Sequence, residues 1–377
     1  MKILYVNTAM ATWGGIERVL VEKMNYLSDR YGYEICLVTA DQGNHPIHYP
    51  LNRSVVYQDL GINFHQQYHY KGIRRFVKKL QLNHLFVKRL RYLILESPPD
   101  IIVSIRSNLT NKIVKAKGDV PLVFESHSSC LAQFVVHPGL FSRLKVLYLN
   151  YSAKYADQVV ALTKGDSKEW RKINSNVCVI PNIVHLNETG LYSNCETKSV
   201  IFVGRYSKQK DISSLLQIWA IVQKDHPDWV LHIYGGYGGE QERLLPKICN
   251  NDNIIIHNPT LNIIEQYLSC SMLLLTSLFE PFGLVLPEAM SCGLPVVAFD
   301  CPYGPADIIT DGVDGFLIKK RDIKDFAEKV CLLMDDLSMR KKMGQAGIVS
   351  SQRFSAERIM PKWKEFFEHI LYNKDRK

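Results

Sequence analysis

The sequence predicts an α/β protein with two Rossmann-like domains, residues 1–185 and 186–355. Two observations lead to this fold class. First, 377 residues are more than one hydrophobic core usually holds, so two domains are expected. Second, the chain contains two series of apolar runs that alternate with helical patterns, an order typical of βαβ units with a parallel sheet. A polar, irregular stretch at residues 187–198 lies between the two series and is expected to be a linker.

The first series begins with an apolar run that is followed by Gly14 and Gly15 and then by a helical pattern from Ile16 to about Arg30. The turn lacks the Gly-x-Gly-x-x-Gly fingerprint of dinucleotide-binding proteins, so no nicotinamide cofactor is expected. The later runs end in polar residues, as strands that face a ligand cleft do in a doubly wound sheet. The expected strands are residues 2–7, 34–39, 101–104, 122–125 and 158–162.

The second series repeats this alternation of strands and helices up to a final strand that ends at Leu317. After it, the tail from Ser355 to Tyr372 has apolar residues at helical spacing, which predicts an amphipathic helix packed on the core. The expected strands of this series are residues 199–205, 229–234, 254–257, 272–276 and 296–299, and its expected helices include residues 212–224 and 261–269.

The composition favours a soluble globular protein of a reducing compartment. Hydrophobic residues make up 46% of the chain and charged residues 22%, which are ordinary values for that class. No apolar stretch approaches the roughly 18 to 20 residues of a transmembrane helix, and the N-terminus lacks the pattern of a secretory signal. The nine cysteines are scattered, without the spacing of a zinc site. A cytoplasmic location is therefore expected.

Positive charge is concentrated in the first half of the chain. Residues 1–185 contain 24 Lys and Arg against 13 Asp and Glu, whereas the remainder contains 22 against 24. No acidic residue occurs between Gly61 and Leu95. The interleaved basic and apolar residues there are Lys71, Arg74, Arg75, Lys78, Lys79, Lys88, Arg89 and Arg91, and Ile73, Phe76, Val77, Leu80, Leu85, Val87, Leu90 and Leu93.

This basic amphipathic pattern predicts a peripheral contact of the 71–91 segment with an anionic membrane, on the inner leaflet of the plasma membrane. The alternative is a solvated helix that packs on its own domain. Nucleic acid is not an expected partner, because no recognised binding motif accompanies the charge.

The stretch Glu280–Pro295 contains the strongest candidate site. It lies between two apolar runs, which places Glu280 in the loop after a buried strand. Pro287 suits the first position of a short helix, with Glu288 in its first turn. Gly283 would let the backbone approach a ligand closely, and free amides at the helix start would favour a phosphate. Two carboxylates around such a turn suit a ligand with sugar hydroxyls at both ends and phosphate between them. The alternative is that one carboxylate ends a strand and the other caps a helix.

This stretch, Glu-x7-Glu in the form Glu-Pro-Phe-Gly-Leu-Val-Leu-Pro-Glu-Ala, resembles the signature of the retaining glycosyltransferases of family four. The resemblance implies the GT-B fold, in which two Rossmann-like domains face a cleft that contains the active site. It also implies that the C-terminal helix, residues 356–377, crosses back to the first domain.

The resemblance further implies how the stretch would bind a nucleotide-sugar donor. Glu280 would contact the hydroxyls of the donor sugar, and Glu288 would hold the ribose. Gly283 and Leu284 would offer backbone amides to the sugar and the diphosphate, and Phe282 belongs to the same donor-binding loop.

A second match is Val203-Gly-Arg205 followed by Lys210, which is similar to the family pattern Val-Gly-Arg and then Lys-Gly. In the family this Arg and Lys grip the donor diphosphate. The chemistry fits, because fixed cations offset the negative charge that accumulates on the leaving diphosphate. Asp211 stands where the family has Gly. The alternative is that Arg205 and Lys210 are two exposed surface cations.

The resemblance also assigns residues of the first domain to the site. Gly14 and Gly15 correspond to a glycine loop across the donor phosphates, and His127 corresponds to a His near the primary hydroxyl of the sugar. From the residues alone, the glycines could simply form the turn, and a single His is more often structural. Acceptor selection is expected to depend on the loops at residues 42–52 and 128–138.

Together these features predict a metal-independent retaining hexosyltransferase. The donor would be a nucleotide sugar, in the first place a UDP-sugar carrying a hexose or N-acetylhexosamine. The acceptor would be a glycan or a polyprenyl-diphosphate-linked glycan, since residues 301–305 resemble those of bacterial enzymes that make surface polysaccharides. No cofactor or metal is expected, because the chain has no Asp-x-Asp pair. The alternatives are a GT-B sugar-nucleotide epimerase or phosphorylase, and a non-catalytic carbohydrate- or lipid-binding scaffold.

Overall fold

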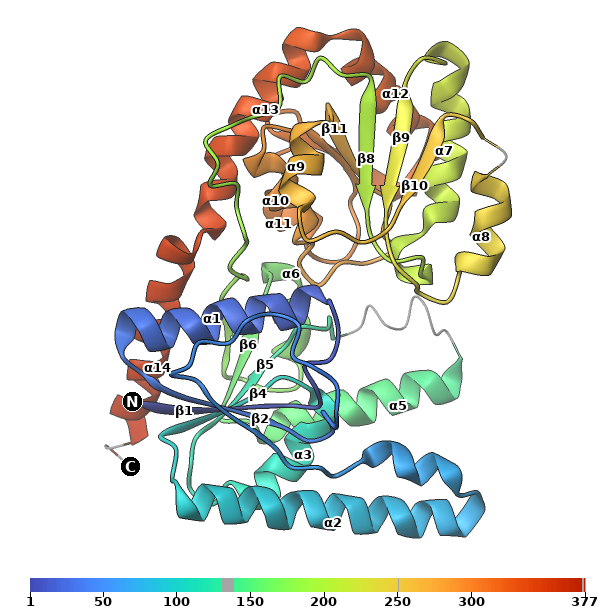
Figure 1. The fold of residues 1–377 in the computed structure, drawn as a ribbon. Helices are drawn as coiled ribbons and strands as arrows, with labels where there is room; N and C mark the ends of the chain where they lie inside the picture. Colours follow the sequence, from blue (N-terminus) through green and yellow to red (C-terminus); the bar gives the residue numbers. More distant parts are fainter. Residues whose placement is uncertain (131–138, 250, 375, 377) are drawn as a thin grey trace. The chain divides into compact units, whose positions relative to one another are not determined.

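The computed structural model describes residues 1–130, 139–249, 251–374 and 376 (Figure 1). The described residues form two compact units. Unit 1 contains the described residues up to Ile183 together with the C-terminal segment from Ile359, and unit 2 contains Val184–Arg358. Most of the 128–138 loop, from which acceptor selection is expected, lies outside the described residues.

Unit 1 is built on a parallel sheet in the order β3-β2-β1-β4-β5-β6-β7. Its central strands are buried on both faces, as expected for a parallel sheet covered by helices. In register, Leu4 of β1 lies opposite Cys36 of β2 and Ile102 of β4. The strands are β1 Lys2–Asn7, β2 Glu34–Thr39, β3 Val56–Asp59, β4 Ile101–Ser104, β5 Leu122–Glu125, β6 Gln158–Ala161 and β7 Val177–Val179.

The four strands predicted at residues 2–7, 34–39, 101–104 and 122–125 are confirmed with these bounds, and β6 ends one residue earlier than predicted. The edge strands β3 and β7 were not predicted. Both are exposed or half-buried along their length, so they lack the continuous apolar run of a buried parallel strand.

Helices cover this sheet and supply its core. Phe86 and Leu90 of one helix, Trp170 of another and Phe124 of β5 are buried in a single cluster. The C-terminal helix also belongs to this unit from Ile359 onward, as the fold class requires. The helices are α1 Gly15–Tyr31, α2 Gly72–Glu96, α3 Ser107–Ala116, α5 Leu140–Tyr151, α6 Lys164–Trp170 and α14 Ala356–Lys374, with short 3-10 turns η1 Phe64–His69 and η2 Ser152–Tyr155.

Unit 2 has a parallel sheet in the order β10-β9-β8-β11-β12-β13, which is the strand order of a Rossmann fold. Its strands are β8 Ser199–Val203, β9 Val230–Tyr234, β10 Ile254–His257, β11 Met272–Leu275, β12 Val296–Phe299 and β13 Gly315–Ile318. Its helices are α7 Ile212–Asp225, α8 Gln241–Ile248, α9 Ile263–Leu268, α10 Val285–Ser291, α11 Pro305–Ile308, α12 Ile323–Asp335 and α13 Leu337–Ser351, with 3-10 turns η3 Lys208–Lys210, η4 Lys319–Arg321 and η5 Gln352–Phe354.

The predicted start of the helix in the Glu280–Pro295 stretch is wrong. Helix α10 begins at Val285, so Pro287 is its third residue and not its first. The helix can start earlier because the first four N–H groups of a helix have no intrahelical acceptor, so a proline within that turn loses no hydrogen bond. Glu288 still lies in the first turn, as predicted.

Helix α2 behaves differently along its length. Its C-terminal half packs on the core through Leu82, Phe86 and Leu90, which are buried. Its N-terminal half exposes large apolar side chains, among them Ile73 at 82% and Phe76 at 61%. Packing on its own domain, the alternative to a membrane contact, thus accounts for only half of this helix. Among the described helices, none is long and apolar enough to cross a membrane.

Because only the C-terminal half of α2 is packed on the core, replacing Phe by Ala should destabilise the protein there and have little effect in the N-terminal half. Phe86→Ala should lower the free energy of unfolding by about 3–5 kcal/mol, because it leaves a cavity in the core of unit 1. Phe76→Ala, ten residues earlier on the same helix, should change it by less than about 0.5 kcal/mol. Urea unfolding followed by circular dichroism measures both values, and equal losses would contradict the packing of α2.

Candidate active site

The carboxyl ends of β8, β9 and β11 carry the polar loops of unit 2. The strand order reverses between β8 and β11, and ligands of open parallel sheets bind at such a switch point. The loop after β8 contains Arg205 and Lys210, the loop after β9 contains the glycines of residues 235–239, and the loop after β11 contains Glu280. These three loops form the candidate donor site.

Lys210 and Glu280 form a largely buried ion pair. Lys210 Nζ lies 2.5 Å from Glu280 Oε1, and the two side chains are only 15% and 6% exposed. Ser277 Oγ donates to the same carboxylate oxygen at 2.6 Å. Because an ammonium has three donor protons and a carboxylate has two acceptor oxygens, both partners retain hydrogen-bonding capacity for a ligand.

Close backbone packing surrounds this pair. A Cβ atom at Gly204 would lie 3.1 Å from Cγ and Cδ of Lys210, so the lysine stem runs directly over this glycine. A Cβ at Gly235 would lie 2.1 Å from the carbonyl oxygen of Gly204, a distance that only glycine permits. Arg205, which follows Gly204, is exposed and has no ion-pair partner within the described part of the chain.

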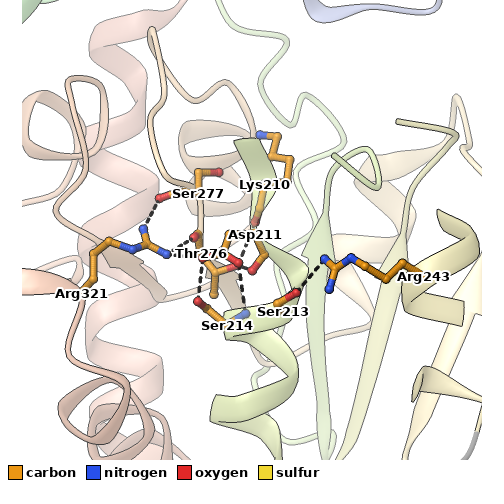
Figure 2. Close-up of polar contacts among 8 residues, drawn as sticks. All are labelled: Lys210, Asp211, Ser213, Ser214, Arg243, Thr276, Ser277 and Arg321. Carbon is orange, nitrogen blue, oxygen red and sulfur yellow. Dashed lines mark hydrogen bonds and ion pairs between the residues drawn. The ribbon is translucent and has the colours of Figure 1, made fainter. Parts of the chain in front are cut away.

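Asp211, which stands where the family pattern has Gly, adopts the left-handed backbone conformation with φ 45° and ψ 56°. Asp enters this region at lower cost than most residues, because its short side chain can hydrogen-bond locally. Here the carboxylate caps α7: it accepts from the backbone N–H of Ser214 at 3.3 Å and from its hydroxyl at 2.6 Å. The same carboxylate accepts from Arg321 at 2.6 Å (Figure 2).

Arg321 ties the loop after β8 to the loop after β11. Its guanidinium donates to the carbonyl oxygens of Ser277 at 2.7 Å and Thr276 at 3.1 Å, in addition to Asp211 (Figure 2). Thr276 Oγ1 in turn donates to the carbonyl oxygens of Lys210 at 3.0 Å and Asp211 at 3.1 Å. The loops that carry Lys210 and Glu280 therefore share one hydrogen-bond network. Arg321 was not predicted: Asp211 in a glycine position signals a departure from the family pattern, but nothing in the local sequence identifies its partner.

The remaining donor-site candidates of unit 2 follow Glu280. Its backbone is fixed by the segment near residue 303, whose Tyr303 N–H donates to the Glu280 carbonyl at 2.9 Å. Gly283 has φ 97°, and Phe282 is buried. Glu288 is 3% exposed, and its Oε2 accepts from the Tyr267 hydroxyl at 3.3 Å.

The candidates of the first domain lie in unit 1. Gly14 is the N-cap of α1 and Gly15 is its first residue. His127 follows β5, is 6% exposed, and its Nε2 lies 2.9 Å from Glu125 Oε1. The structure thus brings Lys210 and Glu280 into contact within unit 2. The site roles assigned to His127, Gly14 and Gly15 in unit 1 stay predictions.

Two family models match the chain. Residues 13–188 match the model described as Glycosyltransferase Family 4, and residues 175–349 match the model described as Glycosyl transferases group 1. Together the two matched ranges cover most of the chain. The chain belongs to glycosyltransferase family four. The family suggested by the Glu-x7-Glu signature is therefore confirmed.

Several proteins resemble this glycosyltransferase over nearly its full length. The amylovoran biosynthesis glycosyltransferase AmsD of Erwinia amylovora is 28% identical over 97% of this chain and 99% of its own. A structure of S. aureus TarM in complex with fondaparinux, α-GlcNAc-glycerol and UDP matches with a TM-score of 0.78 and 16% identity, over 97% of this chain and 99% of that one. A structure of Anabaena HepE with UDP and glucose matches with a TM-score of 0.74 and 20% identity, over 98% and 99%. These likenesses confirm the GT-B fold class.

The conformation of Asp211 in this glycosyltransferase can be tested by comparing two substitutions. Asp211→Ala should lower the free energy of unfolding by about 2 kcal/mol, of which roughly half is the left-handed backbone and half the lost helix cap. Asp211→Gly should cost about 1 kcal/mol less, because glycine adopts this conformation freely. Both variants lose the Arg321 contact, so the difference between their thermal or urea unfolding curves isolates the backbone. Identical curves would contradict the left-handed assignment.

Proposed function

We propose that this glycosyltransferase transfers a hexose or N-acetylhexosamine from a UDP-sugar to a hydroxyl of a glycan or lipid-linked glycan, with retention of the anomeric configuration. The observation that supports the proposal is the contact between Lys210 and Glu280, because a cation suited to a diphosphate lies beside a carboxylate suited to sugar hydroxyls. The UDP bound to TarM and HepE supports the choice of nucleotide. The similarity to AmsD, an amylovoran biosynthesis glycosyltransferase, supports a role in bacterial polysaccharide synthesis.

Each residue of the donor site has a defined task in this proposal. The Lys210 ammonium shares its protons between Glu280 and the diphosphate, and the exposed guanidinium of Arg205 binds the diphosphate as a planar fork. Glu280 also accepts hydrogen bonds from the sugar hydroxyls. Glu288 holds the ribose, and backbone amides of residues 282–284 meet the sugar and the phosphates.

The reaction needs stabilisation of the leaving group more than it needs a protein base. As the glycosidic bond breaks, negative charge grows on the β-phosphate, and Lys210 and Arg205 offset it from fixed positions. The acceptor oxygen bonds to the anomeric carbon on the face from which the diphosphate leaves, and a β-phosphate oxygen takes the proton of the acceptor hydroxyl. UDP departs, and the anomeric configuration is retained. His127 binds the primary hydroxyl of the sugar.

These two cations take the place that a divalent metal has in enzymes with an Asp-x-Asp pair, so we propose metal-independent catalysis. The assay is turnover of a UDP-sugar in EDTA, with and without added Mg²⁺. Equal rates support the proposal, and a rate that depends on Mg²⁺ would contradict it.

We also propose that unit 1 makes a peripheral contact with anionic lipid at the inner leaflet of the plasma membrane. The N-terminal half of α2 combines exposed apolar side chains with basic ones, as interfacial helices do. Helix α5 adds a second exposed apolar surface, formed by Leu140, Phe141, Leu144, Leu147, Tyr148 and Tyr151. A lipid-linked acceptor would be reached from this position.

Lys210→Met should lower kcat/KM for a UDP-sugar by about 10²- to 10³-fold, because it removes one fixed cation from the leaving diphosphate. Lys208→Met is the matched control: Lys208 is an exposed lysine of the same 3-10 turn, and its loss should leave the rate within about twofold. The assay measures release of UDP from a panel of UDP-sugars, with and without acceptor glycans. Equal effects of the two substitutions would contradict the phosphate role of Lys210, and clean epimerisation of the sugar would favour the epimerase instead.

Replacing Arg74, Lys78, Lys79 and Lys88 by Gln should weaken binding to vesicles that contain anionic lipid by tenfold or more, since each basic residue near such a surface contributes about 1 kcal/mol. Binding of the wild type should also fall steeply as salt is raised from 50 to about 500 mM. Arg89 is left in place, because its guanidinium bonds the carbonyl of Leu60. The control removes four exposed lysines outside α2, namely Lys319, Lys324, Lys342 and Lys362. Co-sedimentation that ignores both salt and the α2 substitutions would contradict the membrane contact.

A further inference from the structure

A buried cluster of charged and aromatic side chains lies behind His127 in unit 1. Lys23 of α1 and Glu125 of β5 are each 1% exposed, and they are paired with each other. Tyr5 of β1 and Trp363 of α14 surround the ammonium, whose nitrogen lies 5.3 Å and 4.0 Å from the centres of their rings. Elements far apart in the sequence therefore meet around one ion pair.

Glu125 is ionised in this cluster. Burial alone would raise its pKa, but the neighbouring Lys23 and His127 lower that pKa to about 2. Burial lowers the pKa of Lys23, and the attraction of Glu125 opposes this effect. Two opposite charges in contact and an aromatic face against the cation are how a folded protein holds a lysine away from water.

The ionised carboxylate fixes the position of a proton on His127. Glu125 Oε1 lies 2.9 Å from Nε2, and a carboxylate can only accept, so Nε2 carries the proton. The other carboxylate oxygen is occupied by Lys23. Within the part of the chain that the structure describes, Nδ1 of His127 has no hydrogen-bond partner, and it is the ring nitrogen left for a ligand.

We propose that Glu125 and Lys23 are positioning residues for His127, and that together they present its Nδ1 as a hydrogen-bond acceptor for a hydroxyl of the donor sugar. The proposal rests on the proposed function in one respect, the contact of His127 with the sugar. The division of labour is specific. Glu125 selects the Nε2–H tautomer, and Lys23 balances the Glu125 charge, so that the imidazole does not need a second proton to do so.

Trp363 extends this arrangement to the C-terminal helix. The indole is 2% exposed and covers the Lys23 ammonium. Helix α14 thereby helps to keep Lys23 in place against Glu125, although it contributes no side chain to His127 itself.

The groups that could titrate around Glu125 are few. They are Lys23 from α1, His127, Tyr5 from β1 and Cys178 from β7. Burial raises the pKa of Tyr5 and raises that of Cys178 to about 12, so neither ionises near neutral pH.

The direct test is the protonation state of the His127 ring in the full chain, read from long-range ¹H–¹⁵N correlation spectra of ¹⁵N-histidine-labelled protein. The His127→Asn variant identifies the signals by their disappearance. The expected wild-type pattern at pH 7.5 is a protonated Nε2 and an unprotonated Nδ1. A protonated Nδ1 would overturn the proposal. His127→Asn activity is read separately: if it stays at the wild-type level, the sugar contact of the proposed function fails, whereas the tautomer result still stands.

Lys23→Met tests the charge balance. With its cation gone, the buried carboxylate should draw a second proton onto the imidazole, so the spectrum at pH 7.5 should change to two protonated nitrogens. Activity at pH 7.5 should then fall by about tenfold or more, because a protonated Nδ1 cannot accept a hydrogen bond from a sugar hydroxyl. Lys117→Met, which removes a different ion pair of unit 1, should change neither readout.

A buried carboxylate without its lysine can also prevent folding, so the double variant Lys23→Met/Glu125→Gln is measured beside it. This variant has no buried charge, and its side-chain amide can either accept from Nε2–H or donate to Nε2, so it no longer selects one tautomer. The expected result is signals from both tautomers and a loss of kcat/KM of about twofold or more. Wild-type spectra and rates in the folded double variant would overturn the proposal.

Discussion

Parallel strands end at the same edge of a sheet, and this constraint organises the chemistry of the whole chain. Because β8 and β11 are neighbours at the switch point of unit 2, the loops that follow them must meet. Lys210 and Glu280 are 70 residues apart in the sequence and yet form an ion pair for this reason. In unit 1 the same rule places His127 at the carboxyl end of β5. The fold brings these side chains to the ends of the strands, and local contacts then fix their positions.

Two networks, one in each unit, restrain candidate residues in different ways. In unit 2, Arg321 bonds the backbone of the loop after β11 and the side chain of Asp211, so it restrains the shape of the loops. In unit 1, Lys23 and Glu125 restrain the proton and the orientation of one ring. The first network restrains the loop that carries Lys210. The second, in our proposal, leaves Nδ1 of His127 as a hydrogen-bond acceptor. Replacing Arg321 or Lys23 can therefore lower activity even if neither side chain contacts a ligand.

Much of the fold could be predicted because buried parallel strands are continuous apolar runs, as at residues 2–7 and 122–125. The family could be predicted because the Glu-x7-Glu signature is local and specific. The edge strand β3 could not, since its exposed residues carry no such pattern. Arg321 could not either: it meets Asp211 across 110 residues, and no local spacing encodes that contact. Lys23 is hidden for a similar reason, because one lysine in an amphipathic helix gives no sign of burial. The roles proposed for all the site residues, Lys210 and Glu280 included, stay predictions.

The burial of Trp363 in unit 1 affects the order in which the two units can fold during synthesis. Residues 359–370 supply five buried side chains to a unit whose sheet is encoded before residue 180. During translation, unit 1 therefore cannot complete its core until all of unit 2 has been synthesised, and until then the Lys23 ammonium has Tyr5 beside it but not the indole of Trp363. The nascent protein can finish the later unit first, although it is translated second.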